Sequence, residues 1–251
     1  KNLFGAGKTG KITGMCQDIV IVQEHSVFAG FTTRPSSSAR RRAELAKAAA
    51  ERGGAAVRLN LVHGTAVARV APADVLRAQS GSIDYEDTDA AITDQKNVVL
   101  TSGHGDCLPV YLYDPTVPAI GLAHAGWRGT LGNIAMETVQ AMGLQYSCEP
   151  QNLRAWIGPG IGRCCFEVGA DVAQSFRDRF DWALDYIDPG PGGKYHIDLK
   201  GINHRQLSNC GITAVESSEL CTVCRSDLFY SYRRNRERER MLAYICLKGD
   251  R

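Results

Sequence analysis

Three short apolar runs between residues 98 and 124 constrain the fold of this chain more than any other feature. They are VVLTS (98–102), PVYLYDP (109–115) and AIGLAH (119–124), and glycine or proline lies at their boundaries. Apolar runs of this length between turn residues are typical of buried strands rather than helices. We therefore expect three strands here, with the GHGDC loop (103–107) between the first two.

Helical spacing of apolar residues predicts further elements on either side of these strands. One helix is expected from the HAGWRGT turn (124–130) to about Gly143, and a second over 168–180 after IGPGIG. Asp198 is placed to cap a third helix that ends near Leu207. An alanine-rich helix is expected over 39–52. The run MLAYICL (241–247) predicts a closing strand that is buried on both faces.

Composition indicates one soluble globular domain spanning 1–251. The chain has 251 residues, of which 44% are apolar and 22% charged, and no low-complexity linker divides it. We interpret PGPGG (189–193) as a surface loop inside that domain. No apolar stretch is long enough to span a bilayer and no signal sequence opens the chain, so we expect a cytoplasmic protein without a membrane partner. A net charge of +2 does not indicate a nucleic-acid partner.

The cysteines are expected to be mostly reduced thiols. There are nine, placed irregularly in a chain too long for a small disulfide scaffold. Cys164 and Cys165 are adjacent and cannot easily pair with each other. Cys221 and Cys224 form a CxxC pair, but no second CxxC and no paired histidines at finger spacing accompany it. We therefore interpret them as buried or surface thiols rather than as a second metal site.

Two histidines and one cysteine form the leading candidate for a functional site. His124 ends an apolar run, Cys107 precedes another, and His63 in LVHGTAV follows a third and lies beside a glycine. Together they would give zinc three protein ligands and leave a fourth position open, as in catalytic sites. The sequence does not show that they converge. Ordinary polar histidines and a small buried cysteine are the alternative interpretation.

Five blocks of the sequence resemble a known family. The chain is similar to the laccase-domain, or YfiH-like, proteins, which were first labelled polyphenol oxidases and are now regarded as zinc-dependent purine nucleoside phosphorylases. The likeness extends from about Phe28 to Leu247 and implies a single mixed α/β (α+β) domain of stacked mixed β-sheets covered by helices. The blocks are HGTAV (63–67), GDCLPVYLYDP (105–115), HAGWRGT (124–130), IGPGIGRCCFEV (157–168) and FYSYRRN (229–235).

The resemblance implies a zinc cofactor and a reaction. The family's zinc ligands fall on His63, Cys107 and His124, where the ion would acidify bound water or polarise a substrate atom. The implied activity is cleavage of adenosine, inosine or guanosine with phosphate to the free base and ribose 1-phosphate. Adenosine deamination and methylthioadenosine phosphorolysis are implied as further activities. The preferred nucleoside and the oligomeric state are left open.

Three arginines are candidates for binding phosphate. Arg42, in ARRRAEL, aligns with a family arginine and is the first choice, with a catalytic role in holding the nucleophile. Arg128 lies next to a predicted helix N-terminus. Arg233 belongs to the SYRRN block. We expect Arg40 and Arg41 to lie on the solvated face of their helix.

Asp106 and Glu167 are candidate catalytic carboxylates. Asp106 is placed to accept a hydrogen bond from a ligand imidazole or to act as an acid/base group, and a turn aspartate is the alternative. Glu167 could accept a ribose hydroxyl or carry a proton, and an exposed carboxylate in the first turn of a helix is the alternative. Trp127 and Phe229 could stack a purine, although packing is the simpler expectation for each.

Two features depart from the family pattern. His104 stands where relatives carry a small residue, and it could be a fourth ligand, a proton carrier or a polar loop residue. A fourth ligand would close the open metal position that catalysis needs. TTRPSSS (32–38) leads almost directly into ARRR, where relatives carry a longer loop with glycine, which leaves the pocket entrance undefined.

Two other enzyme classes compete with the phosphorylase. Cys107 could be a nucleophile with His124 as its base, giving a cysteine hydrolase or amidase. A copper-dependent polyphenol oxidase is the other alternative. The chain has six histidines, however, whereas a four-copper laccase needs roughly ten imidazoles.

Overall fold

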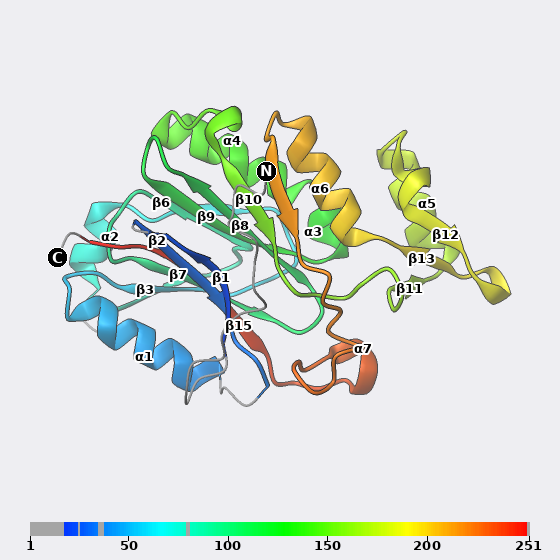
Figure 1. Cartoon of the computed structure of the whole chain (residues 1–251), viewed down its shortest axis with the longest axis horizontal. Coiled ribbons are helices and arrows are strands. Elements are labelled where there is room, and N and C mark those ends of the chain that lie inside the picture. Colours follow the sequence, from blue (N-terminus) through cyan, green and yellow to red (C-terminus); the bar gives the residue numbers. More distant parts are fainter. Residues whose placement is uncertain (1–17, 25, 35–37, 79–80, 250–251) are drawn as a thin grey trace.

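Two six-stranded mixed sheets face each other in the computed structural model, which describes residues 18–24, 26–34, 38–78 and 81–249 (Figure 1). In spatial order, the first sheet contains β1 (Ile19–Gln23), β2 (Val27–Phe31), β15 (Met241–Leu247), β7 (Val99–His104), β3 (Ala56–Leu59) and β5 (Ser82–Tyr85). The second contains β14 (Ala214–Ser217), β10 (Arg154–Ile157), β8 (Leu108–Asp114), β9 (Ala119–Ala125), β6 (Ala90–Thr93) and β4 (Val67–Arg69).

Helices cover the outer faces of both sheets. The first sheet packs against α1 (Ser38–Ala50), and the second against α4 (Ile134–Tyr146) and α6 (Leu199–Asn209). A small third sheet of β11 (Glu167–Val168), β13 (Tyr195–Ile197) and β12 (Ile187–Pro189) lies beside α5 (Ala170–Arg179). Shorter helices are α2 (Pro72–Arg77), α3 (Trp127–Leu131) and α7 (Tyr232–Asn235). The expected single mixed α/β domain with stacked sheets under helices is confirmed.

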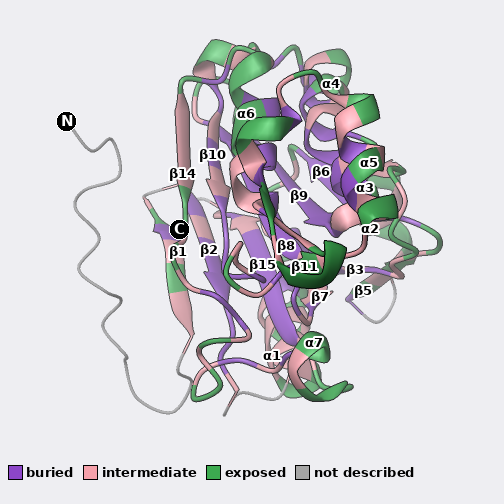
Figure 2. Ribbon diagram, turned by 90° about the vertical axis from the view of Figure 1, so that its right-hand side faces the viewer, coloured by how far each residue is buried: buried purple, intermediate pink, exposed green. Residues whose placement is uncertain are grey.

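The layering follows from strands that are apolar on both faces. In β15, Ala243 and Ile245 face the second sheet, whereas Leu242 and Tyr244 face α1. Successive side chains of a strand point to opposite faces, so a continuous apolar run such as MLAYICL is stable only between two layers. Figure 2 shows this burial along the central strands. The predicted closing strand is therefore confirmed.

The predicted strands and helices are largely confirmed, with differences at helix ends. VVLTS, PVYLYDP and AIGLAH form most of β7, β8 and β9. The Asp198 side chain caps α6 by accepting a hydrogen bond from Gly201 N at 2.9 Å. The helix predicted after HAGWRGT is instead two helices, because Asn133 takes a left-handed conformation (φ 64°) between α3 and α4. The second predicted helix begins at Ala170, since Val168 pairs with Tyr195 in the third sheet.

After Pro189, the last residue of β12, the rest of the PGPGG segment forms an exposed connection to β13, which confirms the predicted surface loop. Among the described residues, no helix has both the length and the apolar character needed to cross a bilayer.

Candidate metal centre and cleft

Strand pairing brings Cys107 and His124 together. In the antiparallel pair β8–β9, Pro109 lies opposite His124, so Cys107, just before β8, comes next to the histidine. His63 reaches the same point from a turn after β3. Its imidazole Nδ1 or Nε2, the Cys107 Sγ and a ring nitrogen of His124 all lie within 4.8 Å of one another. The three residues predicted as ligands from the sequence therefore lie together in the fold.

The backbone around this trio is shaped for close approach. His63 takes a left-handed conformation (φ 62°), which is uncommon outside glycine, although histidine, asparagine and aspartate adopt it more often than other residues. A Cβ at Gly126 would lie 3.0 Å from Cys107 Sγ and 3.1 Å from His63 Cδ2. Any side chain at Gly126 would thus intrude between the candidate ligands, and this explains the glycine in HAGWRGT.

Asp89 organises both histidines. His124 Nδ1 donates to Asp89 Oδ1 at 2.9 Å, which leaves the Nε2 lone pair free for a metal. The same carboxylate accepts the backbone N–H groups of Val62, His63 and Gly64 at 3.1, 3.0 and 2.8 Å. Asp89 is completely buried. It therefore fixes the ring orientation of one candidate ligand and the turn that carries the other.

Opposite charges within the trio stabilise each other. Burial opposes ionisation of Cys107, but the neighbouring imidazole of His124, together with His63, lowers the pKa of this thiol to about 6. Burial likewise opposes protonation of His124, but Cys107 and Asp89 raise its pKa to about 9. A thiolate at neutral pH is the form that binds zinc.

His104 is hydrogen-bonded through both ring nitrogens. Its Nδ1 lies 3.0 Å from the carbonyl oxygen of Cys107, and because a carbonyl only accepts, Nδ1 carries the proton. Its Nε2 then accepts from the Ser102 hydroxyl at 2.7 Å. Burial and the nearby His124 lower the pKa of His104 well below its ordinary value. The neutral ring therefore positions the Cys107 backbone through a hydrogen bond. Both of its nitrogens are already hydrogen-bonded, so neither is directed at the trio.

The trio opens into a cleft of about 700 Å³ that is rich in arginine. Ligand sites commonly occupy roughly 300–1,000 Å³. The three predicted phosphate-binding arginines, Arg42, Arg128 and Arg233, all line this cleft. Arg58 and Arg240 also line it, and neither was predicted from the sequence.

Arg42 differs from Arg58 in how its guanidinium is partnered. Its Nε is buried and has no hydrogen-bond partner among the described residues. Burial and the positive charge of Arg58 lower the pKa of Arg42. By contrast, Arg58 forms a bidentate pair with Asp84, at 3.0 and 2.7 Å. On the same helix, Arg40 is exposed and pairs with Glu44, as expected for the solvated face. The same expectation was wrong for Arg41, whose side chain is only 21% exposed and packs over the Tyr244 ring while it pairs with Asp18.

The other two predicted arginines are held against aromatic rings. The Arg128 guanidinium lies 4.3 Å from the centre of the Trp127 ring, and that of Arg233 lies 5.3 Å from the Phe166 ring. Arg233 Nη1 also donates to the carbonyl oxygens of Cys165 and Glu167 at 3.2 and 2.8 Å. Both positive charges are therefore positioned before any ligand arrives.

Asp106 lines the cleft, and its carboxylate is hydrogen-bonded to three neighbouring groups. Its carboxylate accepts from the Thr222 hydroxyl at 2.6 Å, the Ser231 hydroxyl at 3.1 Å and the Arg233 N–H at 2.7 Å. The hydrogen bond from a ligand imidazole, which we expected Asp106 to accept, is accepted by Asp89 instead. Asp106 thus joins the Cys107 loop to the segment that carries Arg233.

Two further candidates lie outside the cleft. The Glu167 side chain is exposed, with Oε2 3.9 Å from His196 Nε2, and it is not among the cleft-lining residues that the structure describes. The geometry therefore gives no support to a catalytic role for Glu167. Phe229 is fully buried in the core between the sheets, whereas Trp127 lines the cleft. Residues 35–37, in the shortened loop before Ser38, lie outside the described part of the chain.

Comparison with known proteins identifies relatives over most of the chain. Residues 26–248 match the family model described as "Multi-copper polyphenol oxidoreductase laccase". The chain is 37% identical to the purine nucleoside phosphorylase YlmD of Geobacillus stearothermophilus, over 73% of this chain and 69% of that protein. It is also 37% identical to a purine nucleoside phosphorylase of Deinococcus radiodurans, over 85% of this chain and 78% of that protein.

A solved structure agrees with these sequence matches. The crystal structure of the Bacillus licheniformis hypothetical protein YfiH superposes with a TM-score of 0.81 at 30% identity, covering 92% of this chain and 96% of that one. The chain therefore belongs to the laccase-domain, YfiH-like family, whose curated relatives are named purine nucleoside phosphorylases.

Proposed function

We propose that this chain is a zinc-dependent purine nucleoside phosphorylase that uses inorganic phosphate. The observation that carries the proposal is the shared cleft, in which the His63–Cys107–His124 trio opens onto Arg42, Arg128 and Arg233. A dianionic nucleophile needs fixed positive charge, and the arginines supply it. The names of the relatives support the same reaction.

The residues present fit a zinc ion. Two neutral imidazoles and a thiolate form a donor set that zinc prefers, and three protein ligands leave one position for water or substrate. When bound there, zinc supplies a Lewis acid able to polarise a purine atom or acidify water. Asp89 keeps His124 Nε2 directed at the site through the bond to Nδ1.

The arginines would hold phosphate for in-line attack on the sugar. A phosphate oxygen forms a bond to ribose C1′, the C1′–N9 bond breaks, and its electron pair leaves with the purine, which takes up a proton. Arg42 is the proposed main phosphate ligand, because its Nε is buried and has no partner among the described residues. Arg128 and Arg233, which pack against the rings of Trp127 and Phe166, would contribute further positive charge to phosphate binding.

The rest of the cleft offers surfaces suited to a purine. Trp127, Phe166 and Tyr232 line it and provide flat apolar surface close to the trio. Asp106 serves by holding the Arg233 backbone in place rather than by transferring a proton, because its carboxylate already accepts three hydrogen bonds. This assignment replaces the acid/base role considered from the sequence.

Product analysis with and without phosphate tests the proposal. Zinc-loaded protein incubated with adenosine, inosine or guanosine should release free base and ribose 1-phosphate only when phosphate is present. Inosine formed from adenosine without phosphate would reveal deamination as a second activity of the same cleft. The same assay with methylthioadenosine tests whether the chain also cleaves this nucleoside with phosphate. Failure to release base from any of these nucleosides would refute the phosphorylase assignment.

One contact favours a second candidate function, the cysteine hydrolase. Cys107 Sγ lies within 4.8 Å of ring nitrogens of both His124 and His63, whose imidazoles lower the pKa of the thiol, and this arrangement can also activate a nucleophile. A thiolate that binds zinc is not free to attack, so alkylation distinguishes the two. Iodoacetamide should modify Cys107 only after the metal is removed, whereas a hydrolase would be alkylated and inactivated in its native state.

A further inference from the structure

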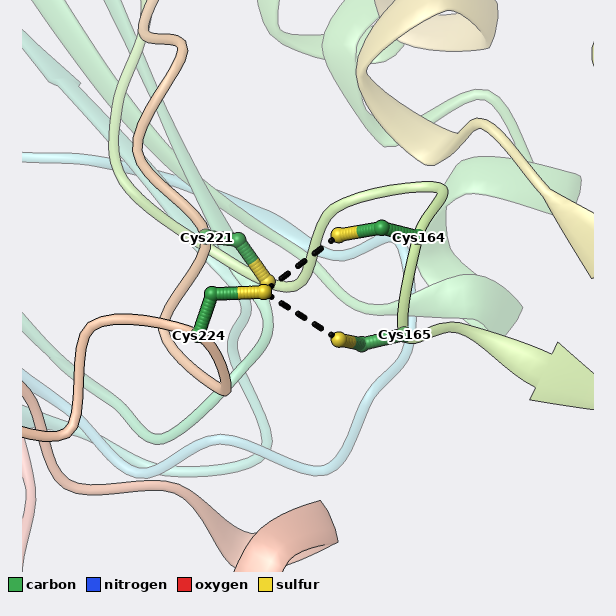
Figure 3. Close-up of side chains that lie close together, drawn as sticks. All are labelled: Cys164, Cys165, Cys221 and Cys224. Atoms are coloured by element: carbon green, nitrogen blue, oxygen red, sulfur yellow. Dashed lines mark hydrogen bonds between the residues drawn. The ribbon is translucent and has the colours of Figure 1, made fainter.

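Four cysteines from two distant segments converge outside the cleft. Cys164 and Cys165 lie in the turn before β11. Cys221 and Cys224 form the CxxC pair in the segment that follows β14. Their four sulfur atoms all lie within 4.8 Å of one another, and they point toward a common centre (Figure 3). Cys224 Sγ is 3.6 Å from Cys164 Sγ and 3.5 Å from Cys165 Sγ.

These separations match a metal tetrahedron. Zinc–thiolate bonds of about 2.3 Å in tetrahedral geometry place the sulfur atoms about 3.8 Å apart. A disulfide needs sulfur atoms at about 2.05 Å and uses only two of the four residues. All four side chains are free cysteines in the structure. We propose that Cys164, Cys165, Cys221 and Cys224 form a second, structural zinc site with four thiolate ligands.

The surroundings suit a site that carries excess negative charge. Gly162 N–H donates to Cys221 Sγ at 3.2 Å, a bond that stabilises a thiolate ligand. A Cβ at Gly162 would lie 3.2 Å from both Cys164 Sγ and Cys221 Cβ, so the turn requires glycine to approach this closely. The Lys200 ammonium donates to the carbonyl oxygens of Ser218 and Leu220 at 2.7 and 2.8 Å, immediately before Cys221.

The site would join two segments that form one wall of the cleft. The first carries Ile161 and Phe166, and the second continues to Tyr232 and Arg233, all of which line the cleft. Hydrogen bonds already join these segments, including Thr222 N to Gly160 O at 3.0 Å and Arg233 Nη1 to the carbonyl oxygens of Cys165 and Glu167 at 3.2 and 2.8 Å. A zinc ion bound by the four thiolates would link both segments without occupying the reaction cleft. All four coordination positions of the zinc would be filled by protein ligands, which is typical of structural zinc sites.

The decisive experiment uses Cys107→Ala protein that is purified without added metal. This variant lacks one of the three ligands of the cleft site, so zinc bound at the four cysteines can be measured separately. Metal analysis should give one zinc per chain, and zinc-edge X-ray absorption should show a shell of four sulfur atoms at about 2.3 Å. Nitrogen or oxygen ligands, iron in place of zinc, or no bound metal would overturn the proposal. A disulfide found among the four cysteines by non-reducing mass spectrometry would also overturn it.

Variants of the otherwise native protein give an independent check. Wild-type protein should hold two zinc ions per chain and Cys224→Ser protein one. Cys210→Ser is the matched control, because Cys210 lies at the end of α6 away from both clusters, and it should retain two. Two ions in Cys224→Ser protein would contradict the assignment. If Cys224→Ser does not fold, the absorption spectrum of the Cys107→Ala protein still decides, and neither result depends on phosphorylase activity.

Discussion

The buried carboxylate of Asp89 accepts a 2.9 Å hydrogen bond from His124 Nδ1 and at the same time binds three backbone N–H groups of the turn that carries His63. One side chain thus sets the geometry of two candidate ligands that are far apart in sequence. Removing an acceptor that orients a ligand histidine typically costs 10- to 100-fold in metal affinity. The metal centre therefore depends on a residue that is not itself a ligand.

Asp89→Asn should weaken zinc binding at the cleft by about 10- to 100-fold, because an amide no longer offers a full negative charge to His124 and to the turn. Competition with a chromophoric chelator measures the affinity. Asp94→Asn is the control, since Asp94 is exposed and directly follows β6, whereas Asp89 directly precedes it. Equal affinity in the Asp89→Asn and wild-type proteins would show that Asp89 does not orient the ligand.

His104→Ala should retain zinc at the cleft, because both ring nitrogens of His104 are engaged by Ser102 and the Cys107 carbonyl. His104→Gln should behave in the same way with a smaller loss of packing. Zinc-to-protein ratios compared with those of Cys107→Ala protein provide the measurement. Loss of one zinc per chain from both His104 variants would show that the site has four ligands.

Arg42→Ala should raise the phosphate concentration needed for base release steeply, since losing a bidentate arginine weakens anion binding by about 1.5–3 kcal/mol. Any phosphate-independent conversion of adenosine to inosine should change much less. Arg40→Ala, on the exposed face of α1, is the matched control and should leave the phosphate dependence unchanged. Equal losses in both reactions would indicate that Arg42 supports the helix rather than phosphate.

Asp106→Ala should lower the free energy of unfolding by about 3 kcal/mol or more, because it leaves two buried hydroxyls and the Arg233 N–H without their acceptor. Thermal unfolding of metal-loaded protein measures the effect. Thr222→Val removes a single one of these bonds and should cost about 1 kcal/mol. A fully stable but inactive Asp106→Ala protein would restore the acid/base role considered from the sequence.

Local patterns predicted much of the fold. The β7, β8, β9 and β15 strands follow from apolar runs, and the Asp198 cap follows from its position before a helix. The break between α3 and α4 was missed, because a left-handed Asn133 leaves the helical spacing of apolar residues on both sides unchanged. A bend of this kind depends on packing that periodicity does not encode.

The site was only partly predictable for a similar reason. His63, Cys107 and His124 belong to recognisable blocks, whereas Asp89 lies in an ordinary DTDAA stretch and acts through strand pairing. The partners of the CxxC pair were missed because they are the adjacent Cys164 and Cys165, a spacing without a familiar zinc pattern. Contacts between distant segments, which determine both features, appear only once the chain is folded.

The most direct test of the central claim compares wild-type and Cys107→Ala proteins for ribose 1-phosphate formation from inosine and phosphate, with zinc content measured on the same samples. The wild type should form ribose 1-phosphate and hypoxanthine in equal amounts. The variant should lack one zinc per chain and lose nearly all of this activity, because two ligands hold zinc poorly. Undiminished phosphorolysis in a Cys107→Ala protein that has lost this zinc would contradict the account.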